Sequence, residues 1–343
     1  MDATTVAVDL AKDVFQIAIS RSSGQVAVRR RLSRRQFALF VESLSAGTTV
    51  VMETCGSAHY WGRRCLARGA DVRLLPAHYV RPYVRRDKTD RADADALLEA
   101  NRCAAIHPVP VKTIEQQTIQ SLHCIRQQWQ RTRTARINVL RALLREQGIV
   151  LAVGAKTIEA RITAVVREPD SPLPVLLRRV LEPLLLELRT VTANVRALDR
   201  ELTGLARTHP VAARLQQIPG IGVITATALL GAVPHIHAFR RGRQFASWLG
   251  LTPWESSSGS RRQIGTLSKR GNTYLRALLV HGARSALRVA ELRAHQSAAA
   301  PLQRWAVATA QRRGRNRATV ALANKLARIV WAVWTRDVDF VAA

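Results

Sequence analysis

Four acidic residues in the first hundred positions lie at the ends of apolar segments or at the start of a helix. Asp9 lies at the end of the apolar run TTVAVDL, and Glu53 ends the run TTVVME. Asp90 and Asp93 are three residues apart at the start of a helical pattern, which places them on one helix face. Because hard divalent cations take carboxylate oxygens as ligands, these acids could together hold two Mg²⁺ or Mn²⁺ ions.

Each of these acids alone could equally be a solvated carboxylate or a helix cap. Asp9 and Glu53 follow apolar strand residues, where an acid that merely contacts solvent is less expected. Other acids compete for the same roles: Asp13 lies one turn from Asp9, while Asp87 and Asp95 flank the helical pair. The spacing by itself does not choose among them.

A second group of candidate residues lies in the loop 252–272, between two apolar segments. Its serines and basic residues are Ser256, Ser257, Ser258, Ser260, Arg261, Arg262, Lys269 and Arg270. The basic residues could bind a scissile phosphate and stabilise charge on its oxygens while a serine attacks. Composition alone also fits a flexible linker. No neighbouring His or Asp is an evident base, so a nucleophilic serine would need activation from elsewhere in the fold or from metal.

The elements that carry the first group predict an α/β domain of about 110 residues. Residues 4–31 form three short β-rich runs with a turn at 22–24, which predicts a three-stranded meander. The remaining pattern predicts helices and strands in alternation: a helix over 33–45 capped by Ser33, a strand over 48–53, a helix over 57–69, a strand over 72–76 and a helix over 90–102.

The middle third of the sequence is helical throughout. A helix over about 113–147 has its expected seam at Leu122, Ile125, Trp129, Arg136, Val139 and Leu143. A heptad pattern follows at Leu177, Leu181, Leu184, Leu188, Val191, Val195, Leu198, Leu202 and Leu205, with Pro183 marking a helix start or a kink. These two helices could form an antiparallel hairpin, could drive self-association, or could do both.

Positive charge dominates the chain and points to a polyanionic partner. The sequence has 53 Lys and Arg against 24 Asp and Glu, a net charge of +29, of which +16 falls in residues 209–343. Such an excess favours nucleic acid over the alternatives of a membrane surface or an acidic protein. In the same third, 215–233 predicts either a helix-hairpin-helix that presents N–H groups to DNA phosphate or a plain packing unit. The expected nucleic-acid contacts are Arg240, Arg241, Arg243, Arg261, Arg262, Lys269 and Arg270.

Composition and cysteine spacing exclude several protein classes. The apolar fraction of 47% excludes a disordered tail, and no apolar run approaches the ~18 residues of a membrane span. The cysteines show no zinc-site spacing and are expected to be reduced thiols: Cys55, Cys65, Cys103 and Cys124. The N-terminus carries acids where a signal peptide needs basic residues, so a cytoplasmic protein is expected.

Several motifs together resemble the DEDD-type insertion-sequence transposases over about residues 4–290. They are VAVDLAKDVF, METCGSAHYWGR, LLPAHYVRPYVRRDKTDRADADALLEA, IPGIGVITATALL and FASWLGLTPWESSSGSRRQIGTLSKRGNTYLRALLVHGARS. The resemblance implies a RuvC-like, that is ribonuclease H-like, α/β domain over 1–112. The remainder is expected to be all-α: the heptad pattern predicts a helical coiled coil over 113–208, and the resemblance implies a mostly helical serine transposase domain with a helix-hairpin-helix-like segment over 209–343.

The resemblance also selects residues and implies a mechanism. The metal-binding acids would be Asp9, Glu53, Asp90 and Asp93, holding Mg²⁺ or Mn²⁺, and the nucleophile would be Ser258, with Ser257 as the near alternative. Such a transposase moves its own element by strand exchange through a serine–DNA intermediate, guided by a noncoding bridge RNA that pairs with donor and target DNA. Its dimers pair into a tetramer with composite sites. Ser260 and Arg261 depart from the Gly and Lys of many relatives.

Two other functions fit the same residues. One is a RuvC-like nuclease in which metal-activated water cuts the DNA and the serine loop only grips it. The other is a non-catalytic scaffold for RNA or DNA.

Overall fold

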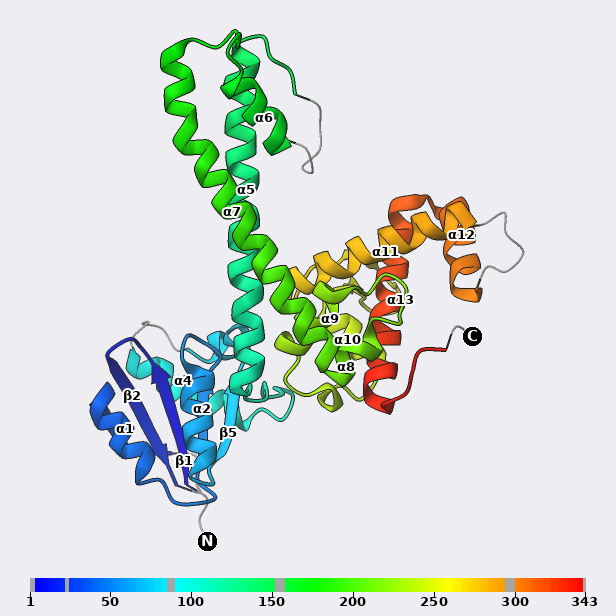
Figure 1. Ribbon diagram of the computed structural model, residues 1–343. Coiled ribbons are helices and arrows are strands. Elements are labelled where there is room, and N and C mark those ends of the chain that lie inside the picture. Colours follow the sequence, from blue (N-terminus) through cyan, green and yellow to red (C-terminus); the bar gives the residue numbers. More distant parts are fainter. Residues whose placement is uncertain (1–3, 22–24, 85–89, 152–157, 294–299, 342–343) are drawn as a thin grey trace. The chain divides into compact units, whose positions relative to one another are not determined.

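The chain forms two compact units in the computed structural model, Met1–Gln117 and Thr118–Ala343 (Figure 1). The structure describes residues 4–21, 25–84, 90–151, 158–293 and 300–341. The helical middle and the C-terminal third fall within one of these two units. The expected division into three parts at 112 and 208 stays a prediction.

A five-stranded mixed sheet forms the centre of the first unit. Its strands are β1 (Thr5–Leu10), β2 (Val14–Ser20), β3 (Val26–Ser33), β4 (Thr49–Glu53) and β5 (Asp71–Leu75), in the order β3-β2-β1-β4-β5. Strands β1, β2 and β3 pair antiparallel, which is the predicted meander, while β4 pairs parallel to both β1 and β5. The parallel pairs bring the carboxyl ends of β1 and β4 to the same edge of the sheet.

Helices cover both faces of this sheet. They are α1 (Arg34–Glu42), α2 (Ala58–Ala67), α3 (Ala77–Val80), η1 (Arg81–Tyr83) and α4 (Asp90–Arg102). Ser33 caps α1 as predicted, forming a capping box with Gln36. On one face, Phe37 of α1 and Trp61 of α2 pack against Phe15 of β2, and on the other face α4 buries Leu97 against the sheet.

A long helical arm makes up the first part of the second unit, apart from the first four residues of its first helix. Its helices are α5 (Ile114–Glu146), α6 (Ile158–Arg167) and α7 (Val175–Thr208). Helices α5 and α7 lie side by side and antiparallel (Figure 1), joined by ion pairs from Arg126 to Asp199 and from Arg136 to Glu187. This confirms the predicted hairpin of helices. Helix α7 begins at Val175, so Pro183 lies inside the helix and does not start it.

The predicted seam of α5 was wrong by about one residue. Ile125, Val139 and Leu143 are exposed, and the buried positions are Ile119, His123, Ile137, Leu140 and Leu144. The physical reason is that the central part of the packing face carries polar residues, with His123 in place of an aliphatic side chain. The spacing of the apolar residues of α5 therefore predicted that the neighbouring face of this helix is buried. The α7 heptads were better placed, with Leu181, Leu188 and Leu202 buried as expected.

The remaining helices enclose the largest apolar core of the second unit. They are α8 (Pro210–Leu215), α9 (Val223–Ala232), η2 (Ile236–Ala238), α10 (Gly242–Trp248), α11 (Thr273–Arg293), α12 (Pro301–Arg313) and α13 (Arg315–Arg336). Helix α13 supplies a buried stripe that includes Leu322, Leu326 and Val330. Helices α8 and α9 are joined by a short turn at Gly220 and Gly222, in agreement with the predicted pair of helices.

Two glycines let the turn between α8 and α9 approach α11 closely. A Cβ at Gly220, whose φ is +91°, would lie 2.6 Å from the carbonyl oxygen of Gly282, and a Cβ at Gly282 would overlap the carbonyl oxygen of Gly220. Backbone atoms cannot yield as a flexible side chain can. These two positions therefore require glycine.

We expect Gly282→Ala to lower the free energy of unfolding by roughly 1–3 kcal/mol, because its Cβ overlaps a fixed carbonyl. Urea unfolding followed by circular dichroism measures the change. Gly204→Ala is the matched control, since Gly204 is also inside a helix and no atom would lie within 4 Å of its Cβ. That control should gain about 0.5–1 kcal/mol, and equal stability of the two variants would contradict the packing argument.

The four cysteines are free thiols, as predicted. Among the described helices, none combines the length and apolarity needed to cross a membrane.

Candidate functional site

Asp9 and Glu53 lie next to each other at the edge where β1 and β4 end. Val8 pairs with Met52 in the parallel register, so Asp9 and Glu53 are the next residues along the two strands. Side chains alternate between the faces of a sheet, and Ala7 and Val51, two residues earlier, face the core beneath α4. Asp9 and Glu53 are therefore on that same face, and both are half-buried.

The electrostatics of Cys55 support this proximity. The pKa of its thiol is raised to about 11, first by desolvation and then by the negative charges of Glu53 and Asp9. The thiol also lies 3.9 Å from the carbonyl oxygen of Leu10, the residue after Asp9. Two carboxylates thus act on one thiol at this edge, which makes the edge a site of concentrated negative charge.

The other two predicted acids begin α4, the helix that packs on the same face. Asp90 is its first residue, and Asp93 is a half-buried residue of its first turn. Asp93 precedes the buried Leu97 and Ala100 by four and seven residues, so it lies on the side of α4 that faces the sheet. Among the described residues, no three His, Cys, Asp or Glu side chains form a group that could hold a metal.

The rival acids are in different situations. Asp95 is bound to Arg29 of β3 at 2.9 Å, and Asp13 is exposed. Asp87 lies outside the described residues. The structure therefore brings Asp9 and Glu53 together and places Asp93 on the covering helix, while the four-acid set stays a prediction.

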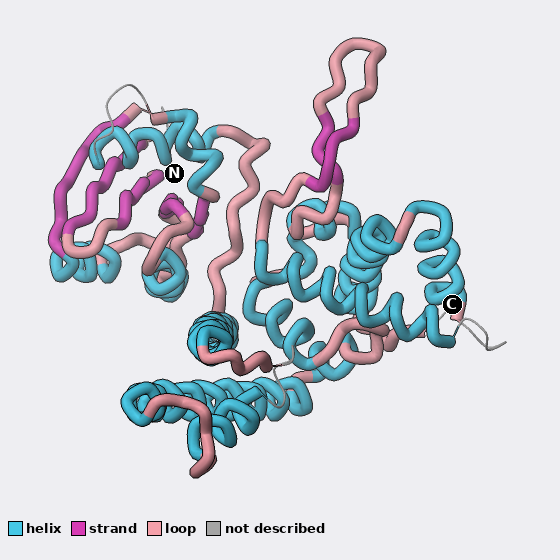
Figure 2. The backbone as a smooth tube through the Cα atoms, turned by 90° about the horizontal axis from the view of Figure 1, so that it is seen from above, coloured by secondary structure: helices cyan, strands magenta, loops and turns pink. Residues whose placement is uncertain are grey.

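The serine segment forms a β-hairpin, where composition also allowed a linker. Strands β6 (Pro253–Glu255) and β7 (Ile264–Leu267) pair antiparallel, and the hairpin extends away from the helices (Figure 2). Its base is fixed by Arg276 of α11, which donates hydrogen bonds to the carbonyls of Leu249 at 3.2 Å and Arg270 at 3.1 Å. The hairpin is thus a defined element on a firm base.

Ser258 begins the turn at the tip of this hairpin. Its N–H and carbonyl pair with the carbonyl and N–H of Arg261 at 3.3 and 3.1 Å, with Gly259 at φ +54° between them. Ser258 is exposed, and within the described part of the chain its hydroxyl has no hydrogen-bond partner. The hydroxyl is therefore accessible to a large substrate.

Ser257 differs from Ser258 in having two partners. Its hydroxyl donates to Glu255 at 2.8 Å and accepts from the N–H of Gln263 at 3.2 Å. The hydrogen bond from Ser257 and the positive charge of Arg262 lower the pKa of the Glu255 carboxyl, which makes Glu255 a weaker base. Sequence reasoning missed Glu255, although it lies only two residues before Ser257.

The predicted nucleic-acid contacts fall into two groups, both exposed. Arg261, Arg262, Lys269 and Arg270 belong to the hairpin and its base. Arg240, Arg241 and Arg243 surround the start of α10. No hydrogen bond or ion pair among described residues joins the two groups.

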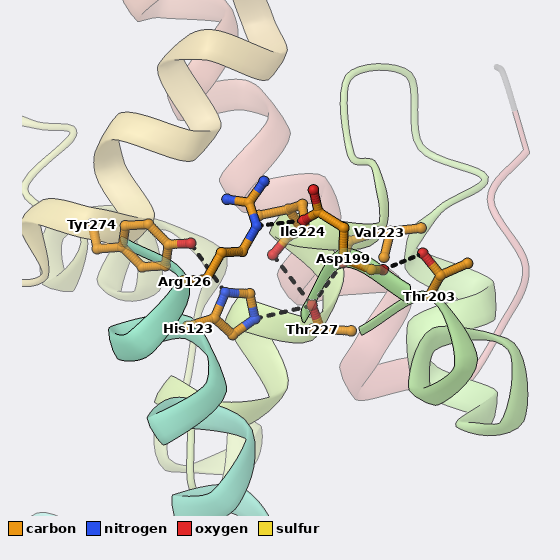
Figure 3. A network of polar contacts seen from close by, with 8 residues as sticks. All are labelled: His123, Arg126, Asp199, Thr203, Val223, Ile224, Thr227 and Tyr274. Atoms are coloured by element: carbon orange, nitrogen blue, oxygen red, sulfur yellow. Dashed lines mark hydrogen bonds and ion pairs between the residues drawn. The ribbon is translucent and has the colours of Figure 1, made fainter. Parts of the chain in front are cut away.

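A buried polar network that sequence reasoning missed lies where α5, α9 and α11 meet (Figure 3). His123 Nε2 and Nδ1 lie 3.0 Å from the hydroxyls of Thr227 and Tyr274, respectively. Thr227 donates its proton to the carbonyl of Val223 at 2.8 Å, so it must accept from Nε2–H, and Nδ1 then accepts from Tyr274. His123 is therefore neutral and fully bonded.

This network predicts a loss of stability in acid. Desolvation, and secondarily the charge of Arg126, lower the pKa of His123 from 6.5 to about 4, while Asp199 opposes the shift. Between these pH values the unfolded chain binds more protons, so the contribution of His123 is full above pH 6.5 and is lost toward pH 4. The loss amounts to roughly 3 kcal/mol.

Urea unfolding across this pH range tests the prediction. His123→Gln should flatten the fall in stability, whereas the exposed His281→Gln should leave it unchanged. His59, whose pKa is also lowered to about 4 by desolvation and by Lys112 and Arg63, contributes equally in both variants. An unaltered slope in His123→Gln would refute the assignment.

Two family models match the segments that contain these sites. A model for DEDD proteins of the IS110 group, described as "Transposase", matches residues 6–148 and includes the acids. A model described as "Transposase IS116/IS110/IS902 family" matches residues 212–298 and includes the hairpin. Residues 299–343 lie beyond both.

Curated relatives are similar over nearly the whole chain. A "Probable family 20 transposase" of Pseudomonas aeruginosa is 40% identical over 98% of both chains. The transposase for insertion sequence element IS1111A of Coxiella burnetii is 40% identical over 98% of this chain and 91% of its own. The transposase for insertion sequence element IS1328 of Yersinia enterocolitica is 33% identical over 98% of both.

Proposed function

We propose that this chain, which belongs to the IS110 family of transposases, excises and inserts its own insertion sequence. The proposed reaction passes through a covalent serine–DNA intermediate. The observation that carries this proposal is the exposed hairpin on which Ser258 presents an unengaged hydroxyl beside Arg261 and Arg262. A serine that must reach a DNA phosphate needs both accessibility and neighbouring positive charge.

In the proposed cleavage step, Ser258 Oγ attacks the scissile phosphorus and forms a phosphodiester with the DNA end. The bond from phosphorus to the neighbouring nucleotide's oxygen breaks, and the serine proton ends on that leaving oxygen. Attack of a hydroxyl from another DNA end on the same phosphorus reverses the exchange and frees the serine. No oxidant or nucleotide cofactor is needed, because each bond broken is replaced by an equivalent bond. Ser257 remains the alternative nucleophile.

The first unit is proposed to be a RuvC-like domain whose acids Asp9, Glu53, Asp90 and Asp93 bind Mg²⁺ or Mn²⁺. The chemistry of these side chains suits a hard cation, and the pair Asp9 and Glu53 brings carboxylate oxygens to one edge of the sheet, on the face covered by the helix that carries Asp93. A bound ion would supply charge stabilisation at the phosphate and would lower the pKa of a coordinated hydroxyl. The chain's own contribution is to hold these carboxylates in register.

The proposed partners are donor and target duplex DNA and a noncoding bridge RNA that pairs with both. The net charge of +29 supports a polyanionic partner, and the identity of the RNA rests on the resemblance. We also propose that dimers pair into a tetramer in which acids and serine come from different subunits. Exposed apolar residues on the arm, among them Val139 of α5 and Val180 and Leu186 of α7, support self-association there.

The experiment that tests the function uses purified protein, the element's flanking RNA, its DNA junction and Mg²⁺. A denaturing gel should show DNA that migrates with protein and is released by protease. Cleaved DNA ends without such an adduct would instead support the alternative, a RuvC-like endonuclease that cuts with metal-activated water. A protein that binds these nucleic acids and never cuts would be a scaffold.

A further inference from the structure

The junction of α12 and α13 presents an unusual concentration of arginine. Residues 311–317, QRRGRNR, are all exposed and contain Arg312, Arg313, Arg315 and Arg317. Gly314, at φ +83°, lets the two helices meet through a single residue. Four guanidinium groups therefore lie around one sharp corner.

Very little negative charge balances this corner. Glu291 is the only acidic residue between Glu255 and Asp337, and it binds Arg315 at 2.7 Å. Two more exposed arginines of α11, Arg284 and Arg288, precede Glu291 by seven and three residues and so lie on its helix face. The corner patch consists of Arg284, Arg288, Arg312, Arg313, Arg315 and Arg317.

The stability of the helices does not account for these arginines. Arg312 and Arg313 suit the C-terminal end of α12, but Arg315 and Arg317 stand in the first turn of α13, where the helix dipole disfavours cations. That first turn contains no acidic residue. The arrangement concentrates positive charge at a local cost, which a bound polyanion would offset.

We propose that the corner patch binds the phosphate backbone of duplex DNA at a distance from the serine hairpin. The hairpin base adjoins the first turn of α11, where Arg276 holds it, and the corner adjoins the last turn, where Glu291 binds Arg315. Helix α11 has 21 residues and so spans about 30 Å. This length is close to one turn of duplex DNA, about 34–36 Å.

A duplex held at the base of the hairpin would therefore reach the corner patch about one helical turn away. Arg284 and Arg288 lie along α11 between the two ends. The patch adds a sequence-independent grip that keeps the DNA in register, since phosphate contacts fix position and carry no direct sequence information. The choice of DNA as partner rests on the proposed function.

The test measures binding of a labelled random-sequence duplex by fluorescence anisotropy over a series of salt concentrations. In the triple variant Arg312→Gln, Arg313→Gln, Arg317→Gln, the slope of log K against log[salt] should become shallower by about 2.7, for three lost phosphate contacts. At physiological salt the affinity should fall ~10- to 100-fold. The conservative triple replacement by Lys should bind like the unmodified protein.

A matched control separates a local contact from a general loss of charge. Arg196→Gln, Arg200→Gln, Arg207→Gln removes the same charge from an exposed face of α7. An equal loss of DNA affinity in both triple variants would overturn the proposal. A corner variant that lost binding to an RNA duplex but kept its binding to DNA would also overturn it. If the unmodified protein bound no DNA, the proposed function itself would fail. If the unmodified protein bound DNA and the corner variant bound it equally well, only the corner-patch proposal would fail.

Discussion

Replacing Asp9 with alanine should lower DNA strand cleavage on the order of 10³-fold while the protein stays folded. Asp9 lies beside Glu53 at the ends of two parallel strands, and its removal would take away one of the four carboxylates proposed to hold a metal ion. The core residues Ala7 and Val51 on the same face and Val8 and Met52 on the opposite face are apolar and stay unchanged, so the sheet should remain folded. Cleavage of the element's junction DNA in Mg²⁺ measures the effect.

Asp13→Ala provides the matched control for this prediction. Asp13 is an exposed acid four residues further on, and spacing alone made it a rival to Asp9. Its removal should change cleavage less than about twofold, as is usual for a surface charge that contacts no substrate. If Asp13→Ala abolished cleavage and Asp9→Ala did not, the assignment of the acids would be wrong. If neither variant lost activity, the chain would not use these carboxylates at all.

The positions of Asp9 and Glu53 at strand ends could be predicted, because the sequence indicates where an apolar strand ends. An apolar run that finishes in an acid places that acid at a sheet edge, and the register of β1 with β4 then sets Asp9 beside Glu53. The capped helix α1 and the meander were predictable for the same reason, since the cap signal at Ser33 and the short β-rich runs are local. The turn predicted at 22–24 lies outside the described residues.

Features that depend on long-range contacts were not predictable in the same way. The buried face of α5 was misplaced because His123 lies in it, and His123 is acceptable there only through partners 104 and 151 residues away. The serine hairpin was not distinguished from a linker, because its base is held by Arg276 and by close backbone approaches at Gly250 and Gly271. Composition contains no information about such contacts.

The clustering of the corner-patch arginines depends on how the helices fold together. Each was visible in the sequence, but their number was attributed to the general positive charge of the last third. Only the one-residue junction at Gly314 and the ion pair from Arg315 to Glu291 show that they gather at the end of α11. Charge counted along a sequence therefore indicates a partner class, while the fold indicates where that partner binds.

Replacing Ser258 with alanine should abolish the protein-linked DNA, with strand exchange reduced on the order of 10⁴-fold or more, since a missing nucleophile has no substitute. The hydroxyl of Ser258 is exposed and forms no hydrogen bond within the described chain, so its loss should leave the hairpin intact. The backbone pairing of Ser258 with Arg261 does not involve the side chain and would persist. Thermal unfolding should therefore be unchanged.

Ser257→Ala is the matched comparison for Ser258→Ala. Ser257 is tied to Glu255 and to the N–H of Gln263, so its removal should loosen the hairpin and slow the reaction while the covalent adduct still forms. An adduct that survives in Ser258→Ala and disappears in Ser257→Ala would move the nucleophile by one residue and make Glu255 its nearest base. Free cleaved ends in both variants, with no adduct in the unmodified protein, would replace the serine mechanism with attack by water.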